Sequence, residues 1–246
     1  MFAKAGIASP TVAFFVSSLD DPGLFFADGT SWEQLAEHWK KFLQTKKVSN
    51  PRVVFMEQVH GGAVCAVSDS ADARVPGVDA LVTNTPGVFV AVKSADCLPV
   101  LLFSEDGRAV AAVHAGFRGT LERITEHAVL SLQENFGISP ENLSAVLGPA
   151  ICARCYNVAK APDDRIARFE AAFGSKMVLR EGARVGLDLR GANRYILEQH
   201  GVPRDRITDV DDCTMHGMIR YPSHFGRKQS ERLISIIGIT NGRSNA

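Results

Sequence analysis

The stretch DALVTNTPGVFVAVKSADCLPVLLFSEDGRAVAAVHAGFRGT, residues 79–120, carries the clearest structural signature in the chain. It holds four short runs rich in Val, Leu and Ala, with turn-forming residues between them at Asn84–Gly87 and Glu105–Gly107. Short apolar runs bounded by such residues are typical of buried strands. We therefore predict strands at Asp79–Thr83, Val88–Lys93, Pro99–Phe103 and Ala109–His114.

On either side of this region, apolar runs of strand length alternate with helical patterns. Ser31 and Gln34 have the spacing of a capping box, which predicts a helix that begins at Ser31. A second helix is predicted over residues 120–136, with a stop at Gly137. The remaining predictions are strands at Val12–Val16, Val53–Met56, Ala63–Val67, Ser144–Leu147, Ile207–Thr208 and Leu233–Ile237, and helices at Asp163–Phe173 and Asp188–Gln199. This alternation favours one α/β domain over residues 1–246.

The composition argues against several classes of protein. The chain has 246 residues, and 27 Lys and Arg balance 27 Asp and Glu, so the formal net charge is zero. A hydrophobic share of 46% excludes a disordered chain, and zero net charge argues against binding to nucleic acid or to a membrane surface. The cysteine count is odd, no signal peptide is evident, and no apolar run approaches the roughly 18 residues of a membrane helix. We expect a cytoplasmic protein without a disulfide framework.

Three segments place reactive side chains at the ends of predicted strands: Gln58–Gly61, Ser94–Pro99 and Val113–Thr120. Together they supply His60, Cys97 and His114. Imidazole and thiolate are ligands that Zn²⁺ prefers, and three protein ligands leave a fourth position open for water or substrate. Taken singly, each residue is more simply a buried cysteine or a structural histidine. Their grouping beside Gly or Pro turn residues strengthens the case for a metal site, and both interpretations stay open at this point.

The segment that follows His114 has a second possible use. Gly116 and Gly119 allow the backbone to approach a ligand closely, and Arg118 offers a fork of hydrogen-bond donors that suits phosphate. The predicted helix that begins near Thr120 would direct free N–H groups toward an anion. An ordinary strand–helix turn with a solvated arginine explains the same residues equally well, so both interpretations stay open.

Other candidate residues lie in the second half of the chain. Cys152 and Cys155 form a C-x-x-C pair that suits redox or metal chemistry, but no second such pair exists, so a structural loop is the favoured interpretation. Cys213 is equally ambiguous. A basic C-terminal stretch suits either contact with an anion or, as the favoured alternative, a solvated surface; it contains His216, Arg220, His224, Arg227, Lys228 and Arg232.

An ordered series of motifs resembles the YfiH-type family, which is also called the laccase-domain or multicopper polyphenol oxidase family and is regarded as purine nucleoside phosphorylases. The series covers roughly residues 53–240 and reads QVHG, VDALVT, SADCLPVLL, VHAGFRGT, LGPAICARCYNV, LDL and CT. The resemblance implies two mixed β-sheets layered between helices, and it implies a catalytic zinc bound by His60, Cys97 and His114. The implied reactions are phosphorolysis of adenosine, inosine and 5′-methylthioadenosine to the free base and a ribose 1-phosphate, and deamination of adenosine.

For the implied reactions, the chemistry of further residues suggests roles that are hypotheses rather than family properties. Arg118 and the adjacent Gly119 would hold phosphate, and Arg232 would contact substrate. Asp96 would either carry a proton or, as the favoured alternative, orient His60 or His114 through a hydrogen bond. Two family motifs differ here. The N-terminal Thr-x-Arg-x-Gly-Gly loop corresponds to residues 15–21 without Arg or a Gly pair, and residues 223–226 lack the double Arg, for which Arg227 and Lys228 would compensate. These changes affect phosphorolysis more than the metal site.

Three hypotheses about function follow. The first is a monomeric zinc-dependent enzyme whose partners are purine nucleosides and phosphate. The second is a hydrolase that edits peptidoglycan precursors, with Cys97 as nucleophile and His114 or His60 as its base. The third is a zinc-stabilised binding domain without activity. A true multicopper oxidase is disfavoured because the chain has seven histidines and no His-x-His pair. Copper is expected only as an alternative occupant of the zinc site.

Overall fold

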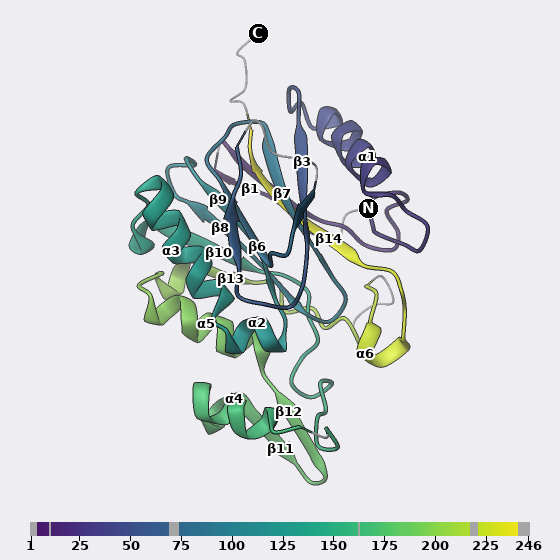
Figure 1. Ribbon diagram of the computed structural model, residues 1–246, viewed down its shortest axis with the longest axis vertical. Helices are drawn as coiled ribbons and strands as arrows, with labels where there is room; N and C mark the ends of the chain where they lie inside the picture. The colour runs from purple at the N-terminus through teal and green to yellow at the C-terminus, as the bar shows by residue number, and fades with distance from the viewer. Residues whose placement is uncertain (1–3, 10, 69–73, 162, 217–220, 241–246) are drawn as a thin grey trace.

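Two six-stranded β-sheets form the centre of the molecule (Figure 1). The computed structural model describes residues 4–9, 11–68, 74–161, 163–216 and 221–240. Each sheet mixes parallel and antiparallel strand pairs, as the family resemblance implied. The four predicted strands of residues 79–115 are all present, and they divide between the two sheets.

The first sheet joins distant parts of the chain around β7. Its order is β1 (Lys4–Ser9), β2 (Val12–Val16), β14 (Leu233–Ile239), β7 (Val88–Ser94), β3 (Arg52–Glu57) and β5 (Arg74–Pro76). Strand β3 runs parallel to β7 and β5, whereas the other pairs are antiparallel. The loops that follow β3 and β7 therefore leave the sheet at the same edge, which brings His60 and Cys97 near each other.

The second sheet is built around the β8–β9 hairpin. Its order is β13 (Ile207–Asp209), β10 (Leu143–Leu147), β8 (Leu98–Ser104), β9 (Val110–Ala115), β6 (Ala80–Thr83) and β4 (Val64–Ala66). In the antiparallel pair β8–β9, Pro99 lies opposite His114. This register places His114 beside the chain segment that contains Cys97.

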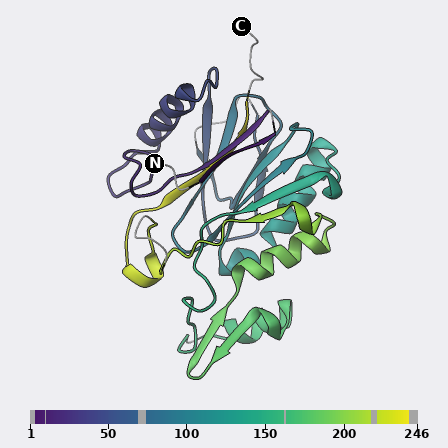
Figure 2. The ribbon, with the colours of Figure 1, turned by 180° about the vertical axis from the view of Figure 1, so that it is seen from behind.

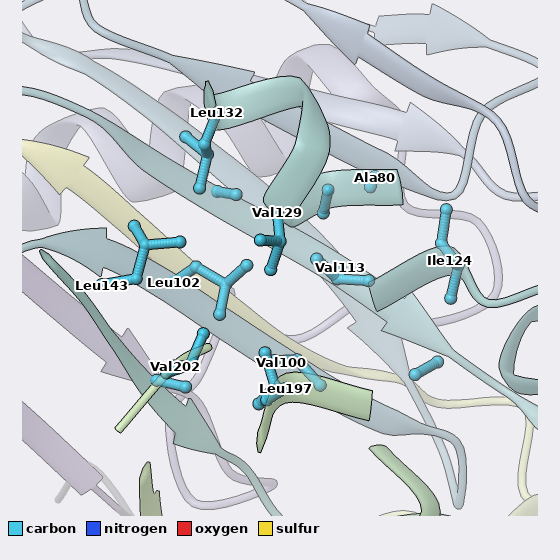
Figure 3. Close-up of a cluster of buried hydrophobic side chains, with 14 of the residues drawn as sticks. Ala80, Val100, Leu102, Val113, Ile124, Val129, Leu132, Leu143, Leu197 and Val202 are labelled. Atoms are coloured by element: carbon cyan, nitrogen blue, oxygen red, sulfur yellow. The ribbon is translucent and has the colours of Figure 1, made fainter. Parts of the chain in front are cut away.

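Helices cover the outer faces of both sheets, so the layers run helix, sheet, sheet, helix (Figures 1 and 2). Helix α1 (Trp32–Thr45) packs on the first sheet through the fully buried Trp39. Helices α3 (Ile124–Phe136) and α5 (Leu189–Gln199) cover the second sheet, and Figure 3 shows part of the apolar cluster that they form with its strands. Burying each such Leu or Val side chain stabilises the fold by about 1.5–3 kcal/mol. The predicted arrangement of two mixed sheets between helices is confirmed.

The helix predicted over residues 120–136 differs from the one observed. It is divided into α2 (Phe117–Leu121) and α3, because Arg123 adopts a left-handed conformation with φ of 58°. Gly116 caps the start of α2, so the helix begins three residues before Thr120. The predicted stop at Gly137 is confirmed, with φ of 67° at that residue.

Several elements were not predicted from the sequence: β1, β5, the hairpin β11 (Val178–Glu181) with β12 (Arg184–Leu187), and α6 (His224–Arg227). The hairpin lies beside α4 (Arg165–Phe173), and the two extend beyond α2 and α5 in Figure 1. Short 3₁₀ turns occur at Pro140–Asn142, Ser175–Met177 and Arg204–Arg206. Among the described residues, none of the helices combines the length and the hydropathy that a bilayer-spanning segment needs.

Candidate metal centre

His60, Cys97 and His114 meet at one point, although they come from three separate segments. His60 follows β3, Cys97 lies between β7 and β8, and His114 belongs to β9. One possible ligand atom from each side chain lies within 4.8 Å of the other two. The two imidazole rings stand nearly perpendicular, with centroids 4.8 Å apart. The group can hold one metal ion.

Asp79, a carboxylate with no exposed surface, fixes the loop that carries His60. Its Oδ1 accepts a hydrogen bond from the backbone N–H of His60 at 3.0 Å. Its Oδ2 accepts from the N–H groups of Val59 at 3.1 Å and Gly61 at 2.7 Å. These bonds hold His60 in a left-handed conformation, with φ of 63°, that a non-glycine residue adopts only when its surroundings enforce it.

The same Asp79 carboxylate orients the ring of His114. Nδ1 of His114 lies 2.8 Å from Oδ1 of Asp79, and both side chains are buried. When Nδ1 donates this hydrogen bond, Nε2 is left as the nitrogen available to a metal. One carboxylate therefore positions both candidate imidazole ligands. Sequence analysis did not single out Asp79, although a lone Asp at the start of an apolar strand was the available signal.

Cys97 and His114 form a mutually stabilising pair in the metal-free protein. Burial opposes ionisation of the Cys97 thiol, but the charge of His114 and hydrogen bonds from both histidines lower its pKa to about 6. Burial also opposes the charged form of His114, but the Cys97 thiolate and the Asp79 carboxylate raise its pKa to about 9. Each group therefore stabilises the charged form of the other, as thiolate and imidazolium.

Two glycines allow the segments to approach closely. A Cβ atom on Gly116 would lie 2.9 Å from Sγ of Cys97 and 3.4 Å from the His60 ring. A Cβ atom on Gly119 would lie 3.1 Å from the carbonyl oxygen of Gly61. The close approach expected of these glycines is therefore made to the protein's own chain, around the candidate metal ligands.

Asp96 is held by partners other than the histidines. Its Oδ1 accepts from Oγ1 of Thr214 at 2.6 Å, and its Oδ2 accepts from the backbone N–H of Phe225 at 2.6 Å. The favoured expectation, a hydrogen bond from Asp96 to His60 or His114, is wrong because Asp79 supplies that contact to His114. Asp96 instead fixes the chain immediately before Cys97, where its own φ is 86°.

A cavity of about 400 Å³ opens beside the candidate metal ligands. Its volume lies in the usual range for small-molecule sites. Its lining includes two cationic side chains, Lys93 and Arg232, and three aromatic rings. Those rings belong to Phe117, Tyr156 and Phe225. The cavity therefore offers a metal-ligand group, positive charge and flat apolar surface together.

The basic residues that the sequence offered for contact with phosphate or another part of the substrate lie in different surroundings. Arg232 lines the cavity, and its Nη1 donates to the carbonyl oxygens of residues 229–231. Arg118 is exposed on α2 and, like Gly119, is not among the described residues that line the cavity. Arg227 is engaged with the carbonyl oxygens of residues 214, 215 and 221. Arg220 lies outside the described residues.

A second group of metal-ligand residues lies in the loops after β10 and β13. Cys152, Cys155, Cys213 and His216 offer ligand atoms within 4.8 Å of one another. This cluster could hold a metal ion, whereas the sequence favoured a structural loop for the C-x-x-C pair over a metal site. The missed signal was Cys213-x-x-His216, which has the spacing of a second ligand pair although it pairs a cysteine with a histidine.

Comparison with known proteins gives consistent results. The model of the family described as "Multi-copper polyphenol oxidoreductase laccase" matches residues 23–240. The purine nucleoside phosphorylase of Deinococcus radiodurans is 42% identical over 150 residues, which are 60% of this chain and 55% of that protein. The protein named adenosine deaminase RL5, from an unknown prokaryotic organism, is 33% identical over 180 residues, 72% of this chain and 63% of that protein. The matches thus span less than two thirds of the length of either relative.

A third relative is similar in both sequence and structure. The purine nucleoside phosphorylase YlmD of Geobacillus stearothermophilus is 34% identical over 201 residues, which are 76% of this chain and 72% of that protein. The match to a crystal structure of YlmD from the same organism covers 98% of each chain. It has a TM-score of 0.83, and 25% of the structurally aligned residues are identical. The layered fold is therefore shared over nearly the whole chain.

Proposed function

Because this chain belongs to the multi-copper polyphenol oxidoreductase laccase family, we propose that it is a zinc-dependent purine nucleoside enzyme. The proposed reactions are phosphorolysis of adenosine, inosine and 5′-methylthioadenosine to the free base and the corresponding ribose 1-phosphate, and deamination of adenosine to inosine. The names of the relatives support this substrate class. The observation that carries the proposal is the meeting of two imidazoles and a thiol beside a cavity lined by cations and aromatic rings.

The donor set fits a catalytic zinc ion. Nitrogen and sulfur ligands suit zinc, and three protein ligands with an open fourth position are the pattern of its catalytic sites. The contact between Asp79 and His114 is the carboxylate–histidine arrangement that commonly supports zinc ligands. Bound by His60, Cys97 and His114, zinc would supply Lewis acidity and lower the pKa of water toward about 7.

The aromatic residues of the cavity lining suit a purine ring. The rings of Tyr156 and Phe225 meet edge to face with centroids 5.3 Å apart. The ring of Phe117 stacks on that of Phe169. Stacking a base on such a ring contributes about 1–3 kcal/mol. We assign purine binding to Phe117, Tyr156 and Phe225, which together would orient the base and exclude water from one side of the sugar.

The two cationic side chains of the cavity lining suit phosphate. Burial lowers the pKa of Lys93, and the nearby charge of Arg232 lowers it further, so an anion between the two relieves their repulsion. Nζ of Lys93 also lies 4.8 Å from the ring centroid of Trp32, a cation–π contact that restricts its position. The phosphate role first expected of Arg118 is therefore better assigned to Lys93 with Arg232.

This arrangement defines the chemical steps that the residues assist. In phosphorolysis, an oxygen of phosphate forms a bond to the sugar C1′, the bond from C1′ to the purine nitrogen breaks, and the base leaves with a proton. Lys93 and Arg232 would hold the phosphate next to C1′, which removes much of the entropic barrier. Asp96, with both oxygens occupied, is a positioning residue for Cys97 rather than a carrier of protons.

The direct test incubates the purified chain with adenosine, with and without phosphate, and separates the products. We expect adenine and ribose 1-phosphate only with phosphate. Inosine is expected in both cases, and its phosphorolysis product hypoxanthine only with phosphate. Cys97→Ser is expected to lose both activities together with the zinc bound by His60, Cys97 and His114. Cys65→Ser, a change to a cysteine on β4 outside the cavity, is the matched control and retains activity. Zinc-loaded protein that converts no purine nucleoside would contradict the proposal and leave a binding domain as the explanation.

The contact between Cys97 and His114 also supports a second candidate function. A thiol beside an imidazole is the arrangement of a cysteine hydrolase, with the sulfur as nucleophile and the ring as base. Metal analysis separates the two candidates. Active protein that carries no zinc at His60, Cys97 and His114 and loses activity when Cys97 alone is alkylated would favour the hydrolase.

A further inference from the structure

The cluster Cys152, Cys155, Cys213 and His216 lies outside the candidate catalytic site and is not used by the chemistry proposed above. Three thiols and one imidazole converge, with their ligand atoms within 4.8 Å of one another. Nδ1 of His216 lies 3.1 Å from Sγ of Cys155 and 3.8 Å from Sγ of Cys152. From this geometry we infer a structural zinc site with four protein ligands.

The chemistry of the ligands selects zinc. A set of three sulfurs and one nitrogen is a recognised structural zinc pattern, whereas hard cations such as Mg²⁺ and Ca²⁺ require oxygen ligands. Four protein ligands fill a tetrahedral ion, so this site, unlike the three-ligand group, has no position left for substrate. A disulfide between Cys152 and Cys155 would use two of the sulfurs and leave the approach of Cys213 and His216 unexplained.

The backbone around the cluster is arranged as in a supported metal site. The N–H of Cys152 points at Sγ of Cys213, with nitrogen and sulfur 3.4 Å apart. Such amide contacts stabilise a thiolate and orient it toward its metal. The N–H groups of Cys155 and Tyr156 both donate to the carbonyl oxygen of Cys152, which closes a tight turn that presents both sulfurs of the C-x-x-C pair on one side.

The site joins two loops that are far apart in sequence. Ala150 and Cys213 form a parallel bridge, in which Ala150 N–H donates to the Asp212 carbonyl and Thr214 N–H donates to the Ala150 carbonyl. This bridge consists of a few weak hydrogen bonds between irregular segments. An ion bound by two residues from each loop would lock the segments together, because each metal bond resists their separation.

The locked loops support the wall of the catalytic cavity. Thr214, next to Cys213, donates to the Asp96 carboxylate, and Ile151, next to Cys152, donates through its N–H to the Asp96 carbonyl. Tyr156, next to Cys155, lines the cavity. The inferred ion therefore fixes Asp96 in its left-handed conformation and, through it, the position of Cys97. It does so from a site that substrate does not touch.

The test measures zinc per chain in protein purified under reducing conditions. We expect two zinc ions in the wild type and one in each of His60→Ala and His216→Ala, because each variant removes a ligand from only one of the two groups. His216 is exposed, so its replacement leaves the core intact. His216→Cys, which restores a fourth ligand, is expected to regain the second ion, and Cys65→Ser is expected to keep both.

X-ray absorption at the zinc edge of the His60→Ala protein identifies the ligands of the remaining ion. We expect three sulfur neighbours at about 2.3 Å and one nitrogen at about 2.0–2.1 Å. The inference is overturned if this protein holds no zinc, if the remaining ion has a different ligand set, or if His216→Ala keeps both ions. Mass spectrometry that finds a Cys152–Cys155 disulfide in freshly reduced protein would overturn it as well.

Discussion

Replacing Asp79 with asparagine tests the residue that positions the candidate metal ligands, and it leaves the ligands themselves unchanged. The carboxylate accepts four hydrogen bonds, two on each oxygen, from His114, His60, Val59 and Gly61. In Asp79→Asn, the side-chain amide keeps one oxygen, and its NH₂ group faces two donors. Losing two hydrogen bonds to a charged group, at about 1.5 kcal/mol or more each, predicts a loss of about 3 kcal/mol in the free energy of unfolding. Loss of the contact to His114 predicts a fall of about 10- to 100-fold in zinc affinity.

Two measurements on Asp79→Asn check this reasoning. Urea unfolding of the metal-free proteins gives the change in stability, and competition with a chromophoric chelator gives the change in zinc affinity. Asp106→Asn, a change at an exposed carboxylate that bonds only within its own turn region, is the control and is expected to alter neither. An Asp79→Asn protein with wild-type stability and wild-type zinc affinity would refute the assigned role of this carboxylate.

Three further predictions concern the same cavity. Gly116→Ala would place a Cβ atom 2.9 Å from Sγ of Cys97, so the zinc content measured by mass spectrometry is expected to fall while the circular dichroism spectrum stays unchanged. An unchanged zinc content would contradict the close approach. In metal-depleted protein, the alkylation rate of Cys97 is expected to be high above pH 6 and to decrease below pH 6, because the charge of His114 lowers the thiol pKa to about 6. A midpoint of the rate near the ordinary thiol pKa of about 8.5 would disprove the pairing. Lys93→Met is expected to raise the KM for phosphate about tenfold or more and to leave the rate of adenosine deamination without phosphate nearly unchanged. An equal loss of rate in both reactions would show that Lys93 does not act on phosphate.

The central strands could be predicted from the sequence because their signal is local. β7, β8 and β9 are continuous apolar runs bounded by turn residues, and nearly every side chain in them is buried. The break at Arg123 could not be predicted in this way, since no Pro or Gly marks it and the left-handed turn depends on tertiary packing. The β11–β12 hairpin was missed because its strands are short and partly exposed.

The candidate site shows the same division between local and distant signals. His60, Cys97 and His114 stood out because each lies at or just after the end of a predicted strand, within a distinctive motif. Asp79 did not, since three of its four partners are backbone amides in a loop that precedes it by about 20 residues, and sequence does not show such contacts. The Cys152 cluster was missed because its two halves meet only through the bridge between distant loops.

The central claim is that His60, Cys97 and His114 share one metal ion, and anomalous diffraction at the zinc absorption edge tests it most directly. Crystals of the full chain, grown without chelator and measured on both sides of the edge, are expected to give an anomalous peak between these three side chains, within bonding distance of all of them. A protein that retains zinc but shows no peak at this position, or shows one bonded to none of the three, would contradict the claim.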